Sequence, residues 1–134
     1  MASVSVRYIV DDVDAAIAFY CGPLGFTEVM HPAPPFAMLE RGDLRLLLSA
    51  PNRGRGGGQI LPGAVPEPGG WNRFGLEYDD VDAVAEELRA AGVSFRTPVV
   101  DGVGGRQVVV EDPSGNPIEL FQPTRPEARL QASG

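Results

Sequence analysis

Asp11-Asp12-Val13-Asp14-Ala15 is the stretch that decides the fold, because the same five residues return as Asp79-Asp80-Val81-Asp82-Ala83. The offset between the two copies is 79 − 11 = 68 residues. Each copy follows an apolar run typical of a strand, residues 4–10 in the first case and residues 74–78 in the second. The chain therefore contains an internal repeat in which a strand leads into an aspartate-rich segment.

A helix is predicted after each copy of the repeat. The second aspartate of each copy, Asp12 or Asp80, stands where an N-cap belongs, because its carboxylate can accept hydrogen bonds from the first helical turn. A glycine, Gly25 or Gly92, is expected where each helix ends. The apolar residues at helical spacing are Val13, Ile17, Tyr20 and Leu24 in the first helix and Val81, Ala85 and Leu88 in the second.

Further strands complete each half of the chain. Polar turns join the last two strands of each half, and one more strand is expected after each helix. These strands are predicted at residues 28–30, 37–40 and 44–49 in the first half and at residues 94–98, 108–111 and 118–122 in the second. The fold class is therefore α+β, with two βαβββ modules in tandem.

The pattern predicts a single domain over residues 1–134, made of two modules, a linker and a tail. The modules span residues 3–51 and 73–123, and the tail, residues 124–134, is expected to be a frayed end after Pro126. The linker, residues 52–72, is rich in Gly and Pro, so regular structure is not expected there. It either only connects the modules or also acts as a lid or binding loop.

Composition excludes several classes of protein. The chain has 134 residues and a net charge of −7, which disfavours binding to nucleic acid. Cys21 is the only cysteine, so no internal disulfide can form. The sequence contains no signal peptide and no apolar stretch of membrane-spanning length, so we expect a cytoplasmic protein that does not insert in membranes.

Two motifs resemble the vicinal-oxygen-chelate superfamily, which includes glyoxalases, bleomycin-resistance proteins and extradiol dioxygenases. Phe19-Tyr20 followed by Leu24-Gly25-Phe26 looks like its opening module, and residues 112–120 look like its closing strand. The resemblance covers residues 3–123. It implies curved mixed sheets around one cleft, helices on the outer face, and a homodimer.

The enzymes of this superfamily hold a divalent metal at four strand positions, usually His, Gln or Glu. The internal repeat places these positions at Ser5, Leu47, Arg73 and Glu119. Leu47 has no donor atom, and Arg73 stays cationic and would repel a metal ion. One carboxylate does not make a zinc or iron site, and the only histidine, His31, lies elsewhere. The resemblance therefore implies a branch without metal, and we expect no cofactor.

An ion pair between Arg73 and Glu119 is expected where a metal–carboxylate bond would be. The pair either balances charge or also contacts a ligand. Strand alternation adds further residues to the same face. The cleft-facing residues expected from the resemblance and from alternation are Ser5, Arg7, Ile9, Arg45, Leu47, Ser49, Arg73, Gly75, Glu77, Glu119 and Phe121. The opposite face is almost wholly apolar and should lie under the helices; it comprises Val4, Val6, Tyr8, Val10, Leu46, Leu48, Phe74, Leu76, Ile118 and Leu120.

Three more side chains are candidates for the ligand site. Trp71, the only tryptophan, precedes a cleft strand and could stack on a planar ligand or plug the junction of the modules. Phe36 and Met38 could form one wall of the cleft or belong to the core.

The hypothesis that these features favour is a metal-independent binding protein that sequesters a small molecule, such as an aromatic or glycopeptide antibiotic or another toxic natural product. One alternative is a metal-free enzyme with Glu119 or Glu77 as base and Arg73 stabilising an oxyanion. A metal-dependent glyoxalase or dioxygenase is supported by the fold alone.

Overall fold

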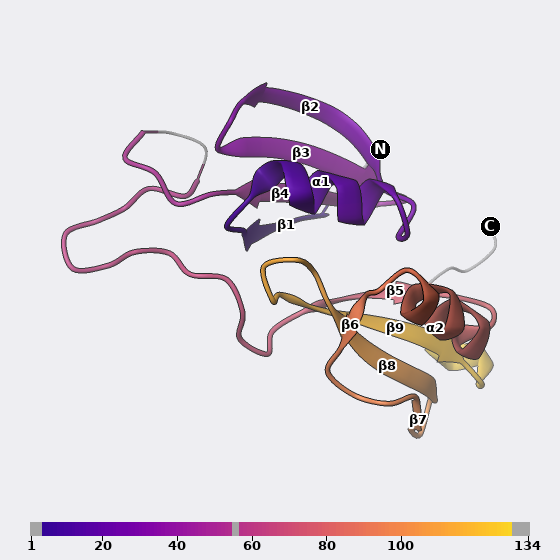
Figure 1. The fold of residues 1–134 in the computed structure, drawn as a ribbon. Coiled ribbons are helices and arrows are strands. Elements are labelled where there is room, and N and C mark those ends of the chain that lie inside the picture. The colour runs from indigo at the N-terminus through magenta and orange to yellow at the C-terminus, as the bar shows by residue number, and fades with distance from the viewer. Residues whose placement is uncertain (1–3, 55–56, 130–134) are drawn as a thin grey trace. The chain divides into compact units, whose positions relative to one another are not determined.

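The computed structural model describes residues 4–54 and 57–129 (Figure 1). By its contacts the chain divides into two compact units. Unit 1 runs to Gly70 and includes Asp112–Asn116, and unit 2 consists of Trp71–Glu111 and the residues from Pro117 onward. Each unit contains one βαβββ module, so the predicted α+β fold class is confirmed.

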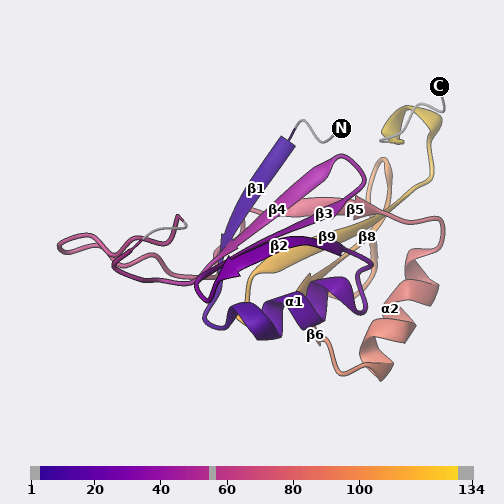
Figure 2. The same ribbon diagram turned by 90° about the horizontal axis from the view of Figure 1, so that it is seen from above.

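Unit 1 is one helix on a four-stranded mixed sheet. Its elements are β1 (Val4–Ile9), α1 (Val13–Cys21), β2 (Thr27–Ala33), β3 (Phe36–Arg41) and β4 (Leu44–Ser49). The order across the sheet is β1-β4-β3-β2; β1 and β4 are parallel, and the other neighbours are antiparallel. Helix α1 packs on this sheet, with most contacts to β3 (Figure 2).

Helix α1 begins as predicted and ends earlier than predicted. The Asp12 carboxylate accepts a hydrogen bond from the N–H of Ala15 at 3.1 Å and caps the first turn. The helix ends at Cys21, not at Gly25, because Pro23 pushes Gly22 out of the helical region and cannot donate a backbone hydrogen bond. The buried helical face is Val13, Ala16 and Tyr20, and Leu24 is buried in the turn beyond the helix.

Unit 2 repeats the plan of unit 1, except that two short strands, β6 and β7, replace the single strand after the helix at the edge of the sheet. Its elements are β5 (Phe74–Glu77), α2 (Val81–Ala90), β6 (Ser94–Phe95), β7 (Val100–Asp101), β8 (Gly105–Glu111), β9 (Pro117–Pro123) and the 3-10 turn η1 (Pro126–Ala128). The order across the sheet is β5-β9-β8-β6, and β7 also pairs with β8. Helix α2 packs against β8 and β9.

Three features of unit 2 bear on the sequence predictions. Asp80 caps α2 by accepting from Ala83, and Gly92 follows the helix with φ +81°, both as predicted. Of the single strand predicted at residues 94–98 only β6 forms, and β7 lies beyond that range, because the N–H groups of Arg96 and Thr97 both point at one carbonyl of β8. The predicted frayed tail contains the turn η1, and residues 130–134 lie outside the described residues.

The predicted apolar face is buried in both units, apart from one end of β1. Val4 is 57% exposed because it starts an edge strand, and Val6 is half-buried. The remaining members of the set are at most 9% exposed: Tyr8, Val10, Leu46, Leu48, Phe74, Leu76, Ile118 and Leu120.

The turn Asp112–Asn116 is held in unit 1 by a buried polar network. The Tyr20 hydroxyl donates to Asp112 Oδ2 at 2.8 Å, and the main-chain N–H of Asn116 donates to Asp112 Oδ1 at 2.9 Å. Asn116 Nδ2 donates to the carbonyl of Ile9 at 2.7 Å. Burial first, and then the charge of Asp112, raises the pKa of Tyr20 well above its ordinary value. The sequence predicted a turn here but gave no sign that its side chains are buried.

Residues 51–72 contain no helix or strand among those described. Two isolated bridges, Asn52 with Gln59 and Leu61 with Ala64, give the segment local order. None of the described helices has the length and apolar character needed to cross a membrane.

Candidate functional site

One face of the unit 1 sheet carries all seven unit 1 residues that the sequence placed in the candidate site. The strand register puts Leu47 beside Arg7 on one side and beside Met38 on the other, and it puts Ser49 beside Phe36. Alternation along each strand places these side chains on the face opposite the buried one. The seven residues are Ser5, Arg7, Phe36, Met38, Arg45, Leu47 and Ser49.

Two arginines flank the apolar side chains of this face. Arg7 Nη1 donates to Ser49 Oγ at 2.8 Å. Arg45 Nε donates to Glu40 Oε2 at 3.3 Å, and Arg45 Nη1 lies 3.1 Å from Met38 Sδ. The side chains of Arg45 and Glu40 are 38% and 43% exposed, so their ion pair contributes little to stability. A ligand group could therefore replace the carboxylate at small cost.

The glycine-rich loop contacts this face at Arg7. Gly57 has φ +86°, and a Cβ atom at Gly57 would overlap the Arg7 guanidinium. The positive φ favours glycine here, and a larger residue would have to displace the arginine side chain. The loop therefore lies against a predicted site residue.

The unit 2 residues of the candidate site gather at β5 and β9. These strands pair in parallel, with Gly75 beside Glu119 and Glu77 beside Phe121. Arg73, directly before β5, places Nη2 at 2.8 Å and Nε at 3.0 Å from Glu119 Oε1. The predicted ion pair therefore forms. Its side chains are 28% and 25% exposed, so it is partly shielded from water.

Trp71 lies beside this ion pair and is itself 65% exposed. Arg73 Nη1 donates to the carbonyl oxygen of Trp71 at 3.2 Å. The guanidinium carbon of Arg96 lies 4.4 Å from the centroid of the Trp71 ring, within the range of a cation–π contact. Arg96 Nε in turn donates to Glu111 Oε2 at 2.8 Å.

Sequence reasoning missed Arg96 and Glu111. In the structure Val109 pairs with Glu119, and alternation along β8 then assigns Glu111 to the Glu119 face. Arg96 follows the short strand β6, and its N–H donates to the Val109 carbonyl at 2.8 Å. The register of β8 could not be read from the sequence, so this neighbourhood was not predicted.

The four positions of a family-type metal site do not fit a divalent metal. Glu119 already accepts two hydrogen bonds from Arg73, whose charge would repel a cation. Leu47 has no donor atom, and Ser5 offers one weak oxygen. Among the described residues, no group of three or more His, Cys, Asp or Glu is arranged to hold a metal ion.

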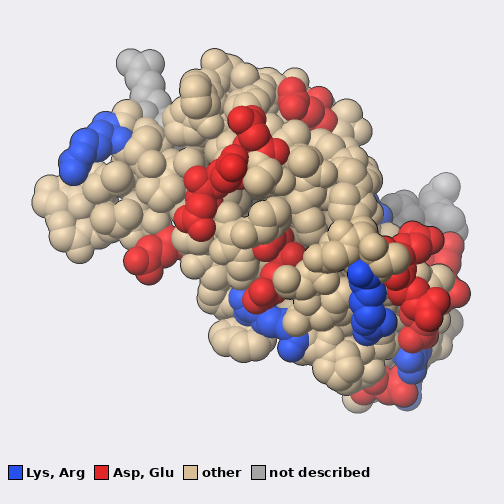
Figure 3. All heavy atoms as spheres, in the orientation of Figure 1, with Lys and Arg blue, Asp and Glu red and all other residues tan. Residues whose placement is uncertain are grey.

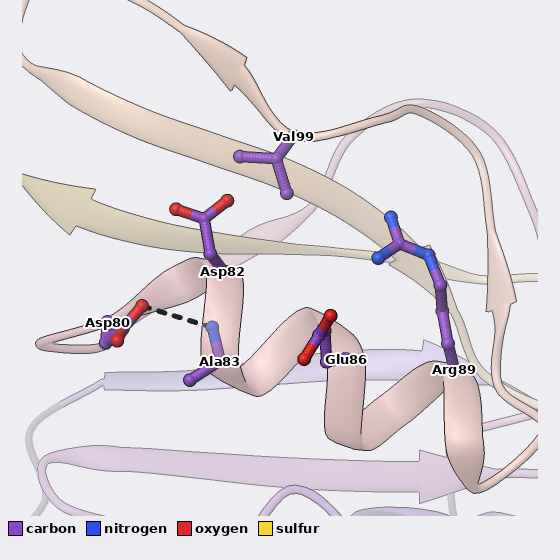
Figure 4. Close-up of a pocket in the computed structure, with 6 residues that line it drawn as sticks. All are labelled: Asp80, Asp82, Ala83, Glu86, Arg89 and Val99. Carbon is purple, nitrogen blue, oxygen red and sulfur yellow. Dashed lines mark hydrogen bonds between the residues drawn. The ribbon is translucent and has the colours of Figure 1, made fainter.

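A surface hollow in unit 2 lies beside α2, and none of the site residues described above lines it (Figure 4). Two of its acidic groups have local partners: Asp80 caps α2 through Ala83, and Asp82 pairs with Arg106 at 2.9 Å. Acidic and basic side chains also lie next to each other over this part of the molecule (Figure 3). We assign no ligand to this hollow, because the groups that line it stabilise the helix and its surroundings.

Comparison with known proteins gives a family match and several similar structures. The sequence profile of the Glyoxalase/Bleomycin resistance protein/Dioxygenase superfamily matches residues 3–120. TnmS3, an antibiotic binding protein from Streptomyces sp. CB03234, is 27% identical, with a TM-score of 0.69 over 92% of this chain and 98% of that chain.

Two further structures differ in their described activity. The bleomycin-binding protein from bleomycin-producing Streptomyces verticillus, in complex with copper(II)-bleomycin, is 25% identical, with a TM-score of 0.60 over 91% of this chain and 96% of that chain. A lactoylglutathione lyase from Agrobacterium tumefaciens is 24% identical, with a TM-score of 0.70 over 90% of this chain and 92% of that chain. At this identity the lyase shows a shared fold and no more.

Proposed function

Because the chain belongs to the Glyoxalase/Bleomycin resistance protein/Dioxygenase superfamily, we propose that it is a metal-independent binding protein for a small organic molecule. The proposed ligand is an aromatic or glycopeptide-type antibiotic or another toxic natural product, which the protein sequesters without changing it. The observation that carries the proposal is the Arg73–Glu119 ion pair, which takes up a position where the superfamily's enzymes use a metal ligand.

The chemistry of the two sheet faces supports an organic ligand over a bare ion. Phe36, Leu47 and Met38 offer apolar surface, and Arg7 and Arg45 stand beside them with polar groups that can fix orientation. Small-molecule sites combine mostly apolar walls with a few placed polar groups. The two antibiotic-binding relatives by structure favour the same class of ligand.

We extend the proposal to assembly and location. The protein is proposed to be a cytoplasmic homodimer with two equivalent ligand sites, because closed two-fold symmetry is the commonest arrangement of soluble oligomers. These two features rest on the family match.

The test is a calorimetric titration of EDTA-treated protein with bleomycin and a panel of aromatic antibiotics, a readout that also works for a variant without Trp71, the only tryptophan. We expect saturable binding without added metal. Trp71→Ala should weaken it at least about tenfold, because lost stacking and lost burial together exceed about 1.4 kcal/mol. Glu119→Gln keeps the shape of the side chain and should have a smaller effect.

Mass spectrometry of the ligand after long incubation separates binding from catalysis. A sequestering protein returns the ligand unchanged. A product that accumulates with time, and that is lost in Glu119→Gln or Glu77→Gln while binding persists, would establish the metal-free enzyme instead.

A further inference from the structure

In the contact between Trp71 and Arg96, the arginine is the more buried of the two side chains. The Arg96 side chain is 15% exposed, whereas Trp71 is 65% exposed. If Arg96 covered the ring from the solvent side, its own side chain would be the exposed one. The guanidinium therefore lies beneath the indole, and the outer face of the ring is open.

Arg96 is itself held from two directions. Its Nε donates to Glu111 Oε2 at 2.8 Å, and its main-chain N–H donates to the carbonyl of Val109 in β8 at 2.8 Å. Both partners belong to one strand, so the guanidinium has a fixed support. A charge-assisted hydrogen bond of this length is among the stronger polar contacts in proteins.

The chain before Trp71 passes through two glycines. Gly69 and Gly70 have φ +108° and +81°, a backbone conformation that other residues rarely adopt. The N–H of Gly69 donates to Asn116 Oδ1 at 2.8 Å, so the main chain is held at this point. The indole ring is contacted by Arg96, and the Trp71 carbonyl accepts a hydrogen bond from Arg73.

We propose that Arg96 is a positioning residue that holds the Trp71 indole as a preorganised platform for a flat aromatic ring of the ligand. The inference rests on the proposed binding function. It adds that Arg96 determines the preference of the protein for planar ligands. A platform fixed before binding improves affinity, because the side chain does not have to be ordered by the ligand.

The first test needs no ligand. Trp71 is the only tryptophan, so time-resolved fluorescence anisotropy reports on this side chain alone. Arg96→Gln removes the cation and should increase the fast local motion of the indole. Arg89→Gln is the matched control, because Arg89 lies 4.6 Å over the Phe95 ring in the same unit and should leave the anisotropy unchanged.

The second test measures binding of anthraquinone-2-sulfonate by calorimetry. This flat probe is an anion, so the net charge of −7 cannot attract it non-specifically. Arg96→Gln should weaken binding about two- to fivefold, the range expected for an exposed cation–π contact. Arg96→Lys keeps the charge and should recover part of the loss, and Arg89→Gln should bind as the wild type does.

The outcomes separate the two proposals. Unchanged anisotropy in Arg96→Gln, or greater indole motion with unchanged affinity, would overturn the positioning role. The binding function would stand in that case if Trp71→Ala still weakened ligand binding. A wild type that does not bind the planar probe, or binds it as well after Trp71→Ala, would count against the platform and the binding function together. In that case the anisotropy still decides whether Arg96 holds the indole.

Discussion

Tyr20 places a hydroxyl group in a part of unit 1 that excludes water. The side chain is 0% exposed, and its hydroxyl donates to Asp112, which is 4% exposed. An unpaired polar group would be costly there, so the two residues depend on each other. They are 92 positions apart in the sequence. Spacing rules found Tyr20 on the buried helical face and Asp112 in a turn, but no local rule could pair them.

Tyr20→Phe should lower the free energy of unfolding by about 1–3 kcal/mol, because the buried Asp112 Oδ2 loses one of its two donors and keeps only Asn116 Nδ2. Urea unfolding at pH 7 measures the change. A loss below about 0.5 kcal/mol, as for an ordinary surface substitution, would show that the hydrogen bond is not important for stability.

The raised pKa of Tyr20 also predicts a pH dependence. In the unfolded chain this phenol ionises near pH 10, and in the folded protein it stays protonated to higher pH. The stabilisation is therefore complete below pH 10 and is lost as pH rises above it. Unfolding free energies from pH 8 to 11 should fall more steeply in the wild type than in Tyr20→Phe. Parallel curves would contradict the assignment.

The glycine-rich loop is the element whose role the sequence left most open. Its composition predicted a segment without helix or strand, and that prediction is confirmed for the described residues. The contact of Gly57 with Arg7 needed coordinates, because the two lie 50 positions apart (57 − 7) and no spacing rule connects them. In contrast, the two helix caps at Asp12 and Asp80 depend only on neighbouring residues and were predicted correctly.

Gly57→Ala tests whether the loop shapes the site. Alanine at positive φ costs about 1–2 kcal/mol, and here its Cβ would also displace Arg7. Gly63→Ala is the matched control, because Gly63 has φ +73° and nothing within 4 Å of an added Cβ. Both variants should lose similar stability in urea, and only Gly57→Ala should also lose ligand affinity. If the two variants bound the ligand with equal affinity, the loop would only connect the modules and would not shape the site.

For the whole molecule, the internal repeat was the most informative feature of the sequence. It predicted two βαβββ modules and, with strand alternation, it assigned most residues to the buried or the open face of each sheet. The predictions were wrong at the ends of elements: the end of α1, the exposed start of β1 and the gap between β6 and β7. At the end of an element, a single proline, or one carbonyl that accepts from two N–H groups, can end the helix or strand although the periodic pattern continues.

Assembly is a separate prediction for the whole molecule. We expect a homodimer by light scattering at concentrations well above micromolar. A monomer of 14.2 kDa under these conditions would contradict the proposed two-fold arrangement.

The central claim is that the protein binds an organic ligand without a metal of its own. Native mass spectrometry tests this most directly, because it weighs the protein, its ligand and any metal ion together. The protein would be treated with EDTA, mixed with the antibiotic that the titrations select, and compared with a sample supplied with zinc, iron, nickel and manganese. We predict one ligand per protomer in both samples, and no metal mass on the ligand-free protein in either. A complex that forms only with about one equivalent of metal, and that is lost in Glu119→Ala, would contradict the account.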